Sequence, residues 1–346
     1  MTKIDIISGF LGAGKTTLIK NLLSNALKGQ QVVLIENEFG EIGIDGGFLK
    51  EAGIEIREMN SGCICCSLVG DFGTALTEVI EKYHPDRIII EPSGVGKLSD
   101  VIHAVEGLEM DSEVALNSAT TIVDVTKCKM YLRNFGEFFR NQVEAAGTII
   151  LSRTDTKKAT EEKVETAVKL IRELNPDATI ITTPVGELDG EKLLDTIEGV
   201  KIDLSHVEEE DHCCDHDHHD HDHHHEHCEH DHSEDGCCCH DHDHHHHHHH
   251  HHDADEVFTS WGRETIKKYD KDELQTILNR LCEEDCFGTV LRAKGMVEGK
   301  DGTWIYFDMV PGETDVRDGD PEYTGRICVI GAELAEDKLQ EAFGLD

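Results

Sequence analysis

A short glycine-rich segment near the N-terminus carries the clearest chemical signal in the chain. It reads GFLGAGKT and matches the spacing G-x-x-x-x-G-K-[ST] of a phosphate-binding loop in full. Glycines let backbone N–H groups close around phosphate oxygens, the lysine reaches the β- and γ-phosphates, and the hydroxyl binds Mg²⁺. An apolar run, IDIIS, precedes the segment and a helical pattern, TTLIKNLLSNAL, follows it, which a chance glycine turn would not explain. The nucleotide site is predicted to contain Gly9, Gly12, Ala13, Gly14, Lys15, Thr16 and Thr17.

Two later loops bear on the identity of the nucleotide and on its metal ion. RIIIEPSG ends an apolar run with Glu91, and Gly94 follows; acids at such strand ends hold Mg²⁺ through water, and a nearby glycine can sense the γ-phosphate. SRTD ends a later run where GTPases carry N-K-x-D, and only Asp155 matches the residue that binds guanine. An ordinary strand-to-loop turn and a polar loop are the alternatives. No glutamine stands in a water-positioning place, so unaided hydrolysis is expected to be slow.

Three of the thirteen cysteines lie within four positions, in the segment SGCICCSL. The thiolates of Cys63, Cys65 and Cys66 could face one soft ion, and three ligands leave a fourth position open, which suits an ion that must leave. A redox trio and buried apolar thiols are the alternatives. Glu36 and Glu41 precede the thiols and are candidate further metal ligands or carboxylates of a nucleotide-sensitive switch, unless they are simply solvated acids.

A second concentration of metal-binding side chains occupies residues 212–252, which hold 22 histidines and six cysteines. Imidazole and thiolate suit Zn²⁺, Ni²⁺, Cu²⁺ and Co²⁺. A tract without a preorganised geometry is expected to store several ions with modest selectivity. A solvated linker and an engineered tag are alternatives, although the longest histidine run is internal and merges with an HDHDH pattern. The auxiliary ligands are represented by His212, Cys213, Cys214, Cys237, Cys238, Cys239 and His244.

The remaining cysteines give weaker signals. Cys282 and Cys286 are four positions apart, which would place them on one helix face as a metal pair, but core packing is the favoured interpretation. Cys128 and Cys328 are expected to be structural.

These residues must be positioned by elements that change in character along the chain. Over residues 1–200, β-branched runs alternate with amphipathic stretches such as TEEKVETAVKLIREL, which predicts a P-loop NTPase fold with a doubly wound, mainly parallel α/β sheet. Residues 201–256 are predicted to form a disordered His/Asp/Cys-rich tract, because 207–256 contain only two aliphatic residues. Residues 257–346 are predicted to form a small α+β domain. The expected parallel strands are VVLIE, RIIIE, TTIVDV, TIILS and TIITT.

Composition excludes some partners. The formal net charge is -39, and 207–256 contain eighteen acidic and no basic residues. Such a chain repels nucleic acid backbones and anionic membranes, so neither is an expected partner. The N-terminus shows no secretory signal and no apolar run approaches a membrane span, so a cytoplasmic location is expected. Clustered cysteines in that compartment indicate metal or redox chemistry rather than disulfides.

Four motifs in order give the chain a family resemblance: GFLGAGKTT, ENEFGEIGID, GCICC, and a strand that ends in E-x-x-G from Glu91 to Gly94. The chain resembles the CobW-type branch of the metal-delivery P-loop GTPases, which are relatives of the urease and hydrogenase nickel-insertion GTPases. RAKG (292–295) and RICVIG resemble the C-terminal domain of that family. SRTD in place of N-K-x-D is the main departure.

The resemblance implies a GTPase that carries a metal ion to an apo-enzyme and uses GTP hydrolysis to release it. The expected cofactors are GTP, Mg²⁺ and Zn²⁺, with Ni²⁺ or Co²⁺ as alternatives, and the expected partner is an unidentified client metalloenzyme. Lys15, Thr16 and Glu91 are the expected catalytic residues, and Thr16 and Glu91 would hold Mg²⁺. A metal-buffering protein with a vestigial P-loop and a thiol-redox switch are the other hypotheses.

Overall fold

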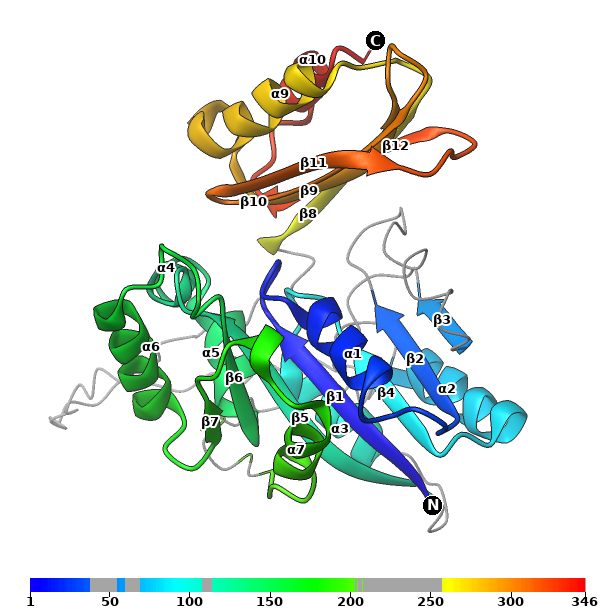
Figure 1. Ribbon diagram of the computed structural model, residues 1–346, viewed down its shortest axis with the longest axis vertical. Coiled ribbons are helices and arrows are strands. Elements are labelled where there is room, and N and C mark those ends of the chain that lie inside the picture. The colour runs from blue at the N-terminus through cyan, green and yellow to red at the C-terminus, as the bar shows by residue number, and fades with distance from the viewer. Residues whose placement is uncertain are drawn as a thin grey trace, which may run out of the picture. The chain divides into compact units, whose positions relative to one another are not determined.

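The computed structural model describes residues 1–37, 55–59, 69–107, 114–202, 204, 207 and 257–345. The described residues contain two β-sheets, one of seven strands and one of five (Figure 1). Met1–Val207 and His252–Asp346 belong to one compact unit. Most of the segment predicted for 201–256 lies outside the described residues, so that part of the predicted domain division stays a prediction.

The first sheet has the strand order β3-β2-β4-β1-β5-β6-β7, and every neighbouring pair is parallel. This order confirms the predicted doubly wound parallel sheet. One strand is longer than its sequence pattern indicates, because β5 begins at Val114 and pairs with the whole of β1 across a register shift. The strands are β1 (Thr2–Gly9), β2 (Val32–Asn37), β3 (Glu55–Met59), β4 (Arg87–Glu91), β5 (Val114–Asp124), β6 (Thr148–Ser152) and β7 (Thr179–Ile181).

Helices cover both faces of this sheet (Figure 1). The apolar side chains of α1 and α7 pack on one face, and those of α2 to α6 pack on the other. The N-terminus of α6 is capped by Thr160, whose side chain accepts a hydrogen bond from the Lys163 N–H. None of the described helices is long and apolar enough to span a membrane. The helices are α1 (Lys15–Ser24), α2 (Val69–Tyr83), α3 (Leu98–Glu106), α4 (Cys128–Asn134), α5 (Gly136–Glu144), α6 (Glu161–Leu174) and α7 (Gly190–Ile197).

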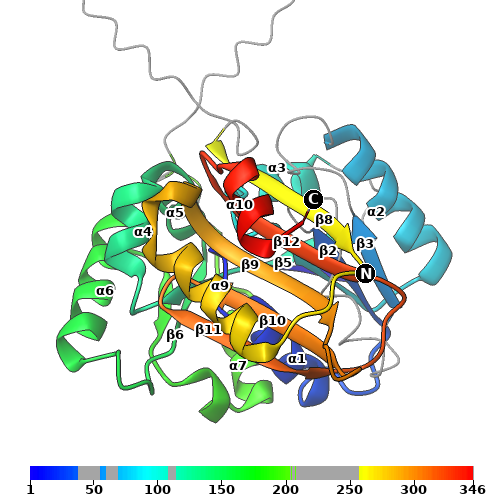
Figure 2. The ribbon, with the colours of Figure 1, turned by 90° about the horizontal axis from the view of Figure 1, so that it is seen from above.

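The second sheet is antiparallel and has the order β11-β10-β9-β12-β8. Two helices, α9 (Lys271–Glu283) and α10 (Glu336–Phe343), lie on one of its faces (Figure 2). This sheet confirms the predicted α+β domain. Its strands are β8 (Thr259–Thr265), β9 (Thr289–Glu298), β10 (Trp304–Val310), β11 (Glu313–Gly319) and β12 (Gly325–Ala332).

The two faces of the second sheet contribute to different cores, because side chains alternate along a strand. Ala293 and Phe307 belong to the cluster that includes the apolar side chains of α9 and α10. Met296, Cys328 and Ile330 belong instead to the cluster that includes the helices and strands of the parallel sheet. The second sheet therefore completes the hydrophobic core of the first.

The structure corrects one prediction about cysteines. Helix α9 ends at Glu283, so Cys286 lies beyond it and does not share a helix face with Cys282. Both thiols are exposed, so the expectation of core packing is wrong. Cys128 and Cys328 are buried, as expected for structural residues, and burial together with the nearby Asp124 raises the pKa of the Cys128 thiol to about 12.

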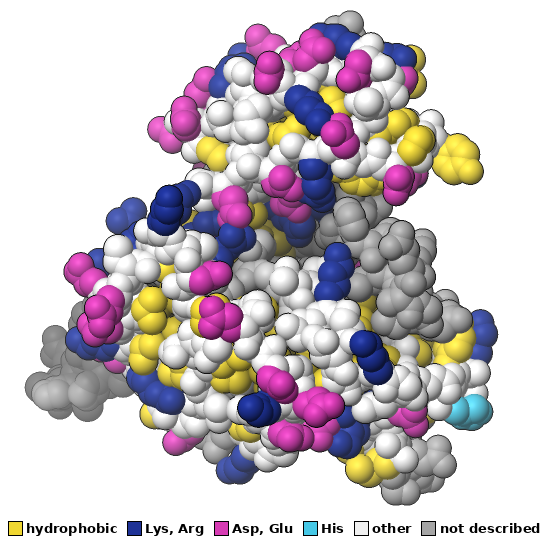
Figure 3. Space-filling view, viewed as in Figure 1, with side chains coloured by type: hydrophobic (Ala, Val, Ile, Leu, Met, Phe, Trp, Pro, Cys, Tyr) yellow, Lys and Arg dark blue, Asp and Glu magenta, His cyan; other side chains and the backbone are white. Residues whose placement is uncertain are grey.

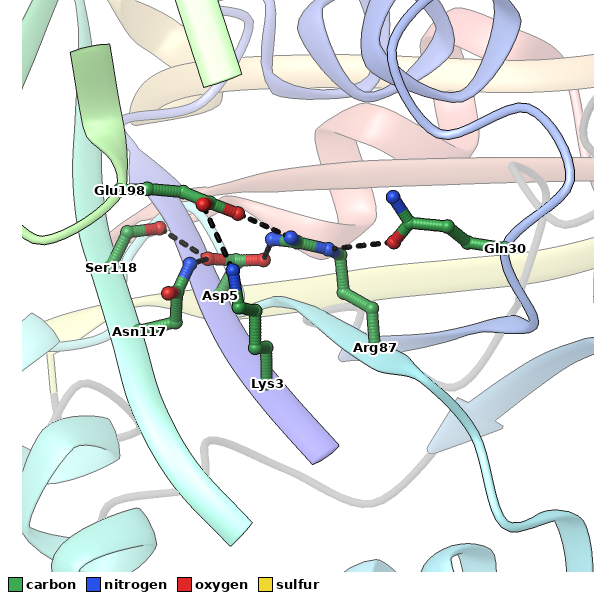
Figure 4. Close-up of polar contacts among 7 residues, drawn as sticks. All are labelled: Lys3, Asp5, Gln30, Arg87, Asn117, Ser118 and Glu198. Atoms are coloured by element: carbon green, nitrogen blue, oxygen red, sulfur yellow. Dashed lines mark hydrogen bonds and ion pairs between the residues drawn. The ribbon is translucent and has the colours of Figure 1, made fainter. Parts of the chain in front are cut away.

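A buried polar network joins the amino ends of the central strands (Figure 4). Arg87, which is 2% exposed, forms ion pairs with Asp5 and Glu198. The second carboxylate oxygen of Asp5 accepts hydrogen bonds from Asn117 Nδ2 at 2.7 Å and Ser118 Oγ at 2.6 Å. Because buried charges are tolerated only when paired and hydrogen-bonded, this network fixes β1, β4 and β5 to the segment that follows α7.

Glu198 makes the stability of this network depend on pH. Burial raises the pKa of Glu198, but hydrogen bonds from Lys3 and Arg87 outweigh that effect and hold the pKa below its usual value. A carboxylate with a depressed folded-state pKa contributes stability that is present above its unfolded pKa, about 4.3, and is lost as the pH falls through the folded pKa.

We predict that Glu198→Gln lowers the free energy of unfolding by about 1 kcal/mol at neutral pH, a figure discounted for the partial exposure of this carboxylate. The difference between the parent and the variant should stay constant above about pH 5 and shrink below about pH 4. Urea unfolding at a series of pH values measures it. A difference that persists unchanged in acid would contradict the assignment to the Glu198 charge.

Candidate nucleotide site

The phosphate-binding loop runs from the carboxyl end of β1 into the first turn of α1, as its sequence predicts. Gly12 has a φ of 68°, a left-handed conformation that favours glycine. A Cβ atom at Gly12 would lie 2.5 Å from Cγ1 of Val310, so β10 packs directly against the loop. The loop is therefore held between two sheets and tolerates no side chain at this point.

The side chains expected to act on phosphate and Mg²⁺ lie together. Lys15 is 8% exposed, and its Nζ donates a hydrogen bond to the Gly9 carbonyl at 2.8 Å. The Thr16 hydroxyl donates to Glu91 Oε1 at 3.3 Å. Glu91 is the last residue of β4, whose neighbour in the sheet is β1. The structure thus brings the two predicted Mg²⁺ ligands, a hydroxyl and a carboxylate, next to the phosphate loop, and both are oxygen donors of the kind that Mg²⁺ prefers.

The loop after β4 also touches the phosphate loop. A Cβ atom at Gly94 would lie 2.8 Å from Leu11 Cδ2 and 2.9 Å from the Leu11 backbone nitrogen. The Gln142 side chain, which is fully buried on α5, donates to the carbonyl oxygens of Gly94 at 3.2 Å and Gly96 at 2.8 Å. Gln142 has no motif around it in the sequence, so its role was not predictable from residue spacing.

In the SRTD segment, the contacts with the phosphate loop are made by Arg153, a residue that departs from the N-K-x-D pattern. Arg153 has a φ of 59°, and its Nη2 donates to the Gly12 carbonyl at 3.2 Å. Its Nε lies 3.1 Å from Asp124 Oδ2 at the end of β5, and its Nη1 pairs with Glu313 of β11. Asp155, the predicted guanine-binding residue, lies two positions after Arg153 in the sequence, and its side chain is exposed. Arg153 therefore ties the SRTD segment (residues 152–155), the predicted base loop, to the phosphate loop.

A cavity of about 430 Å³ opens beside these residues. The phosphate loop, Glu91 and Arg153 form one side of it, and side chains of β9, β10 and β11 form the other. In the space-filling view, acidic and basic side chains are interspersed over this face of the molecule (Figure 3). The C-terminal lining residues are Arg292, Asp308, Val310, Glu313, Asp315 and Arg317.

Two family models match the chain. The model described as CobW/HypB/UreG, nucleotide-binding domain, matches residues 3–182, and that of the cobalamin synthesis protein cobW C-terminal domain matches residues 258–344. The chain belongs to the CobW/HypB/UreG family. The resemblance drawn from the GFLGAGKTT and RICVIG motifs is confirmed, and each β-sheet corresponds to one matched domain.

Curated members of this family with similar sequences are named as zinc chaperones. The zinc chaperone CobW of Sinorhizobium sp. is 35% identical over 230 residues, which is 58% of this chain and 64% of the relative. The zinc chaperone YeiR of Escherichia coli (strain K12) is 30% identical over 193 residues, 56% of this chain and 58% of the relative. The chain thus spans about three-fifths of the length of these two relatives.

The chain is also similar, at lower identity, to solved structures. The Zn(II)-bound YjiA GTPase from E. coli is 20% identical, has a TM-score of 0.41, and aligns over 99% of this chain and 98% of that one. HypB from Helicobacter pylori in complex with nickel is 17% identical with a TM-score of 0.39, over 56% of this chain and 83% of that one.

Several predicted ligands of this family member lie outside the described residues: Glu41, Cys63, Cys65, Cys66, and the tract ligands His212, Cys213, Cys214, Cys237, Cys238, Cys239 and His244. Glu36 is described, is 3% exposed, and stands in register with Glu91 on the neighbouring strand. Within the described ranges, no group of three or more His, Cys, Asp or Glu side chains is arranged to hold a metal ion.

We predict that Gly94→Ala lowers nucleotide affinity about tenfold or more, because the added methyl group would displace Leu11 and with it the phosphate loop; overpacking of this kind costs about 1–3 kcal/mol. Titration with fluorescent GDP measures the effect. Gly186→Ala is the matched control, since a Cβ there meets no atom within 4 Å. Equal affinities in the two variants would show that the contact with Leu11 is not needed.

Proposed function

We propose that this protein is a GTP-hydrolysing metallochaperone that binds Zn²⁺ at Cys63, Cys65 and Cys66 and delivers it to a client protein in a nucleotide-dependent way. The names of the curated relatives support zinc as the cargo, and nickel or cobalt would suit the same thiolates. A cytoplasmic location fits this role, because a reducing compartment keeps the thiols available to metal.

The observation that carries this proposal is the alignment of strand ends. Four adjacent strands, β3-β2-β4-β1, run parallel, so their carboxyl ends share one edge of the sheet. In that order they lead to the cysteine segment after Met59, to Glu36, to Glu91 and to the phosphate loop. Ligands of α/β sheets bind at this edge. Segments that leave one edge can respond to the same nucleotide.

Each phosphate-site residue has a defined part in the proposed hydrolysis. Lys15 would offset charge on the β- and γ-phosphates, and Thr16 with Glu91 would hold Mg²⁺. The chemistry that Mg²⁺ would supply there is neutralisation of negative charge on the phosphoryl group. Gly94 would face the γ-phosphate, and Asp155 would select guanine. Hydrolysis is proposed to be slow without metal or client, because no residue has been assigned to position the attacking water.

Glu36 and Glu41 are the proposed link between the nucleotide and the metal. Glu36 lies near the carboxyl end of β2, Glu41 follows it in the chain, and both precede the thiols. A γ-phosphate with Mg²⁺ orders segments of this kind. One of these two carboxylates could complete the coordination shell of the metal ion in one nucleotide state and withdraw from it in the other. Delivery would then follow hydrolysis.

The decisive experiment measures coupling. We predict that the affinity for Zn²⁺, measured by chelator competition, differs between the GTP-analogue and GDP forms by about 5- to 150-fold, and that Zn²⁺ changes the ratio of GTP to GDP affinity by the same factor. The measurement uses a variant without residues 208–256, so that Zn²⁺ bound to the histidine-rich tract does not contribute to the measured affinity.

The control for this experiment is a triple variant, Cys63→Ser, Cys65→Ser and Cys66→Ser, which should lose the coupled ion and keep nucleotide binding. Equal Zn²⁺ affinities in both nucleotide states, with hydrolysis indifferent to metal, would favour a metal-buffering protein. Reversible oxidation of the trio without stoichiometric metal would favour a redox switch.

The histidine-rich tract is proposed to store metal. Deleting residues 208–256 should remove several weakly held ions and leave about one tightly held ion per chain, because the tract carries most of the histidines. Binding to the tract should fall as histidines protonate near about pH 6. Elemental analysis of both proteins after dialysis at neutral and mildly acidic pH measures this. Loss of GTP binding on deletion would instead assign the tract a structural role.

A further inference from the structure

The turn between β10 and β11 contacts both loops of the candidate nucleotide site. Val310 packs against Gly12 of the phosphate loop. The carbonyl oxygen of Gly312 accepts a hydrogen bond from Lys158 Nζ at 2.6 Å, and Glu313 forms an ion pair with Arg153. Lys158 and Arg153 both follow β6, the strand that ends in the base loop. One turn of the C-terminal domain therefore holds the phosphate loop and the base loop at the same time.

Arg153 depends on this turn for its position. Its backbone is left-handed, which is unfavourable for a residue with a side chain and persists only where surrounding contacts fix it. Its guanidinium group has three partners: the Gly12 carbonyl, to which it donates a hydrogen bond, and the carboxylates of Asp124 and Glu313, with which it forms ion pairs. Two of these partners belong to the nucleotide-binding domain and one to the C-terminal domain. Glu313 is thus part of the support that directs Arg153 toward the phosphate loop.

The same face of the C-terminal sheet lines the cavity beyond the turn. Arg292 pairs with Asp308 at 2.7 Å, and Arg317 pairs with Asp315; all four side chains line the cavity. The opposite face of β11 does not, because Asp318 pairs with Lys271 of α9 at 2.6 Å. A nucleotide on the phosphate loop would therefore have the C-terminal sheet as its second wall.

We propose that the C-terminal domain is a structural part of the guanine-nucleotide site, and that Glu313 is a positioning residue that slows nucleotide release through Arg153. This inference rests on the proposed nucleotide binding. Separation of the wall formed by the C-terminal sheet from the phosphate loop would ease the departure of a bound nucleotide, and the contacts of Glu313 and Gly312 resist that separation. By reciprocity, a bound nucleotide that favours the closed wall strengthens the contact between the two domains.

The test measures the rate at which fluorescent GDP leaves the full-length protein after excess unlabelled GDP is added. Glu313→Gln should raise this rate about three- to tenfold, the kinetic equivalent of losing one partly exposed ion pair that supports a second hydrogen bond. Lys158→Gln should act in the same direction, since it removes the other contact of the turn. Glu313→Asp, which keeps the charge, should restore part of the slow release.

Asp318→Asn is the matched control, because it removes an acid from the same strand on the face away from the cavity. It should leave the release rate within about twofold of the parent. In an Arg153→Met background, Glu313→Gln should have no further effect, because the two residues act as a pair.

The outcomes separate this inference from the proposed function. A parent protein that binds GDP, with release unchanged by Glu313→Gln and Lys158→Gln, would overturn the inference and leave the proposed function standing. Equal acceleration by Asp318→Asn would overturn it as well, because the effect would then be general to the sheet. A parent protein that binds no guanine nucleotide would overturn both.

Discussion

Parallel pairing of the central strands is the constraint on which the rest of the site depends. Ile6 of β1 stands opposite Ile90 of β4, and Gly9 stands opposite Ile122 of β5. This register brings Glu91, at the end of β4, to within two residues of the level at which the phosphate loop leaves β1. The hydrogen bond between Thr16 and Glu91 then needs no further adjustment of the chain. A shift of one residue would turn every strand side chain to the other face and separate this pair.

The two edges of the parallel sheet have different tasks. At the amino edge, Arg87 and its carboxylates satisfy one another and leave no charge for a ligand, so this edge serves stability. At the carboxyl edge, backbone N–H groups of the loop, a lysine and a carboxylate converge on one cavity. Rigid packing behind that edge comes from both helical layers and from the second sheet. Binding groups are thus carried by loops on a scaffold that is fixed elsewhere.

Features encoded by local spacing were predictable from the sequence. The phosphate loop depends on eight consecutive residues, and the β-branched runs mark the strands because buried parallel strands need apolar side chains on both faces. The expectation that Cys282 and Cys286 share a helix face was wrong for a local reason too: the helix ends at Glu283, and a spacing of four residues carries no information on where a helix stops.

Contacts between segments that are distant in the sequence could not be predicted from residue spacing. Arg153 and Glu313 are 160 positions apart, and nothing around either residue indicates the other. Gln142 holds the loop at Gly94 from a helix whose sequence predicts only amphipathic packing. Both contacts arise from how layers stack, and the pattern within each segment does not encode that stacking. The residues that link the nucleotide loops to the rest of the protein were therefore the ones that the sequence left unmarked.

The points at which the histidine-rich segment joins the described chain have an evolutionary consequence. Val207 before it and Val257 after it both pack against the same hydrophobic cluster. The entropic cost of closing a connection between two fixed points grows slowly with its length, by about 0.6 kcal/mol for each doubling. Insertions and deletions of histidine codons between these two anchors would therefore change the stability of the fold very little. Selection can therefore adjust the number of histidines between Val207 and Val257 almost independently of the two β-sheets.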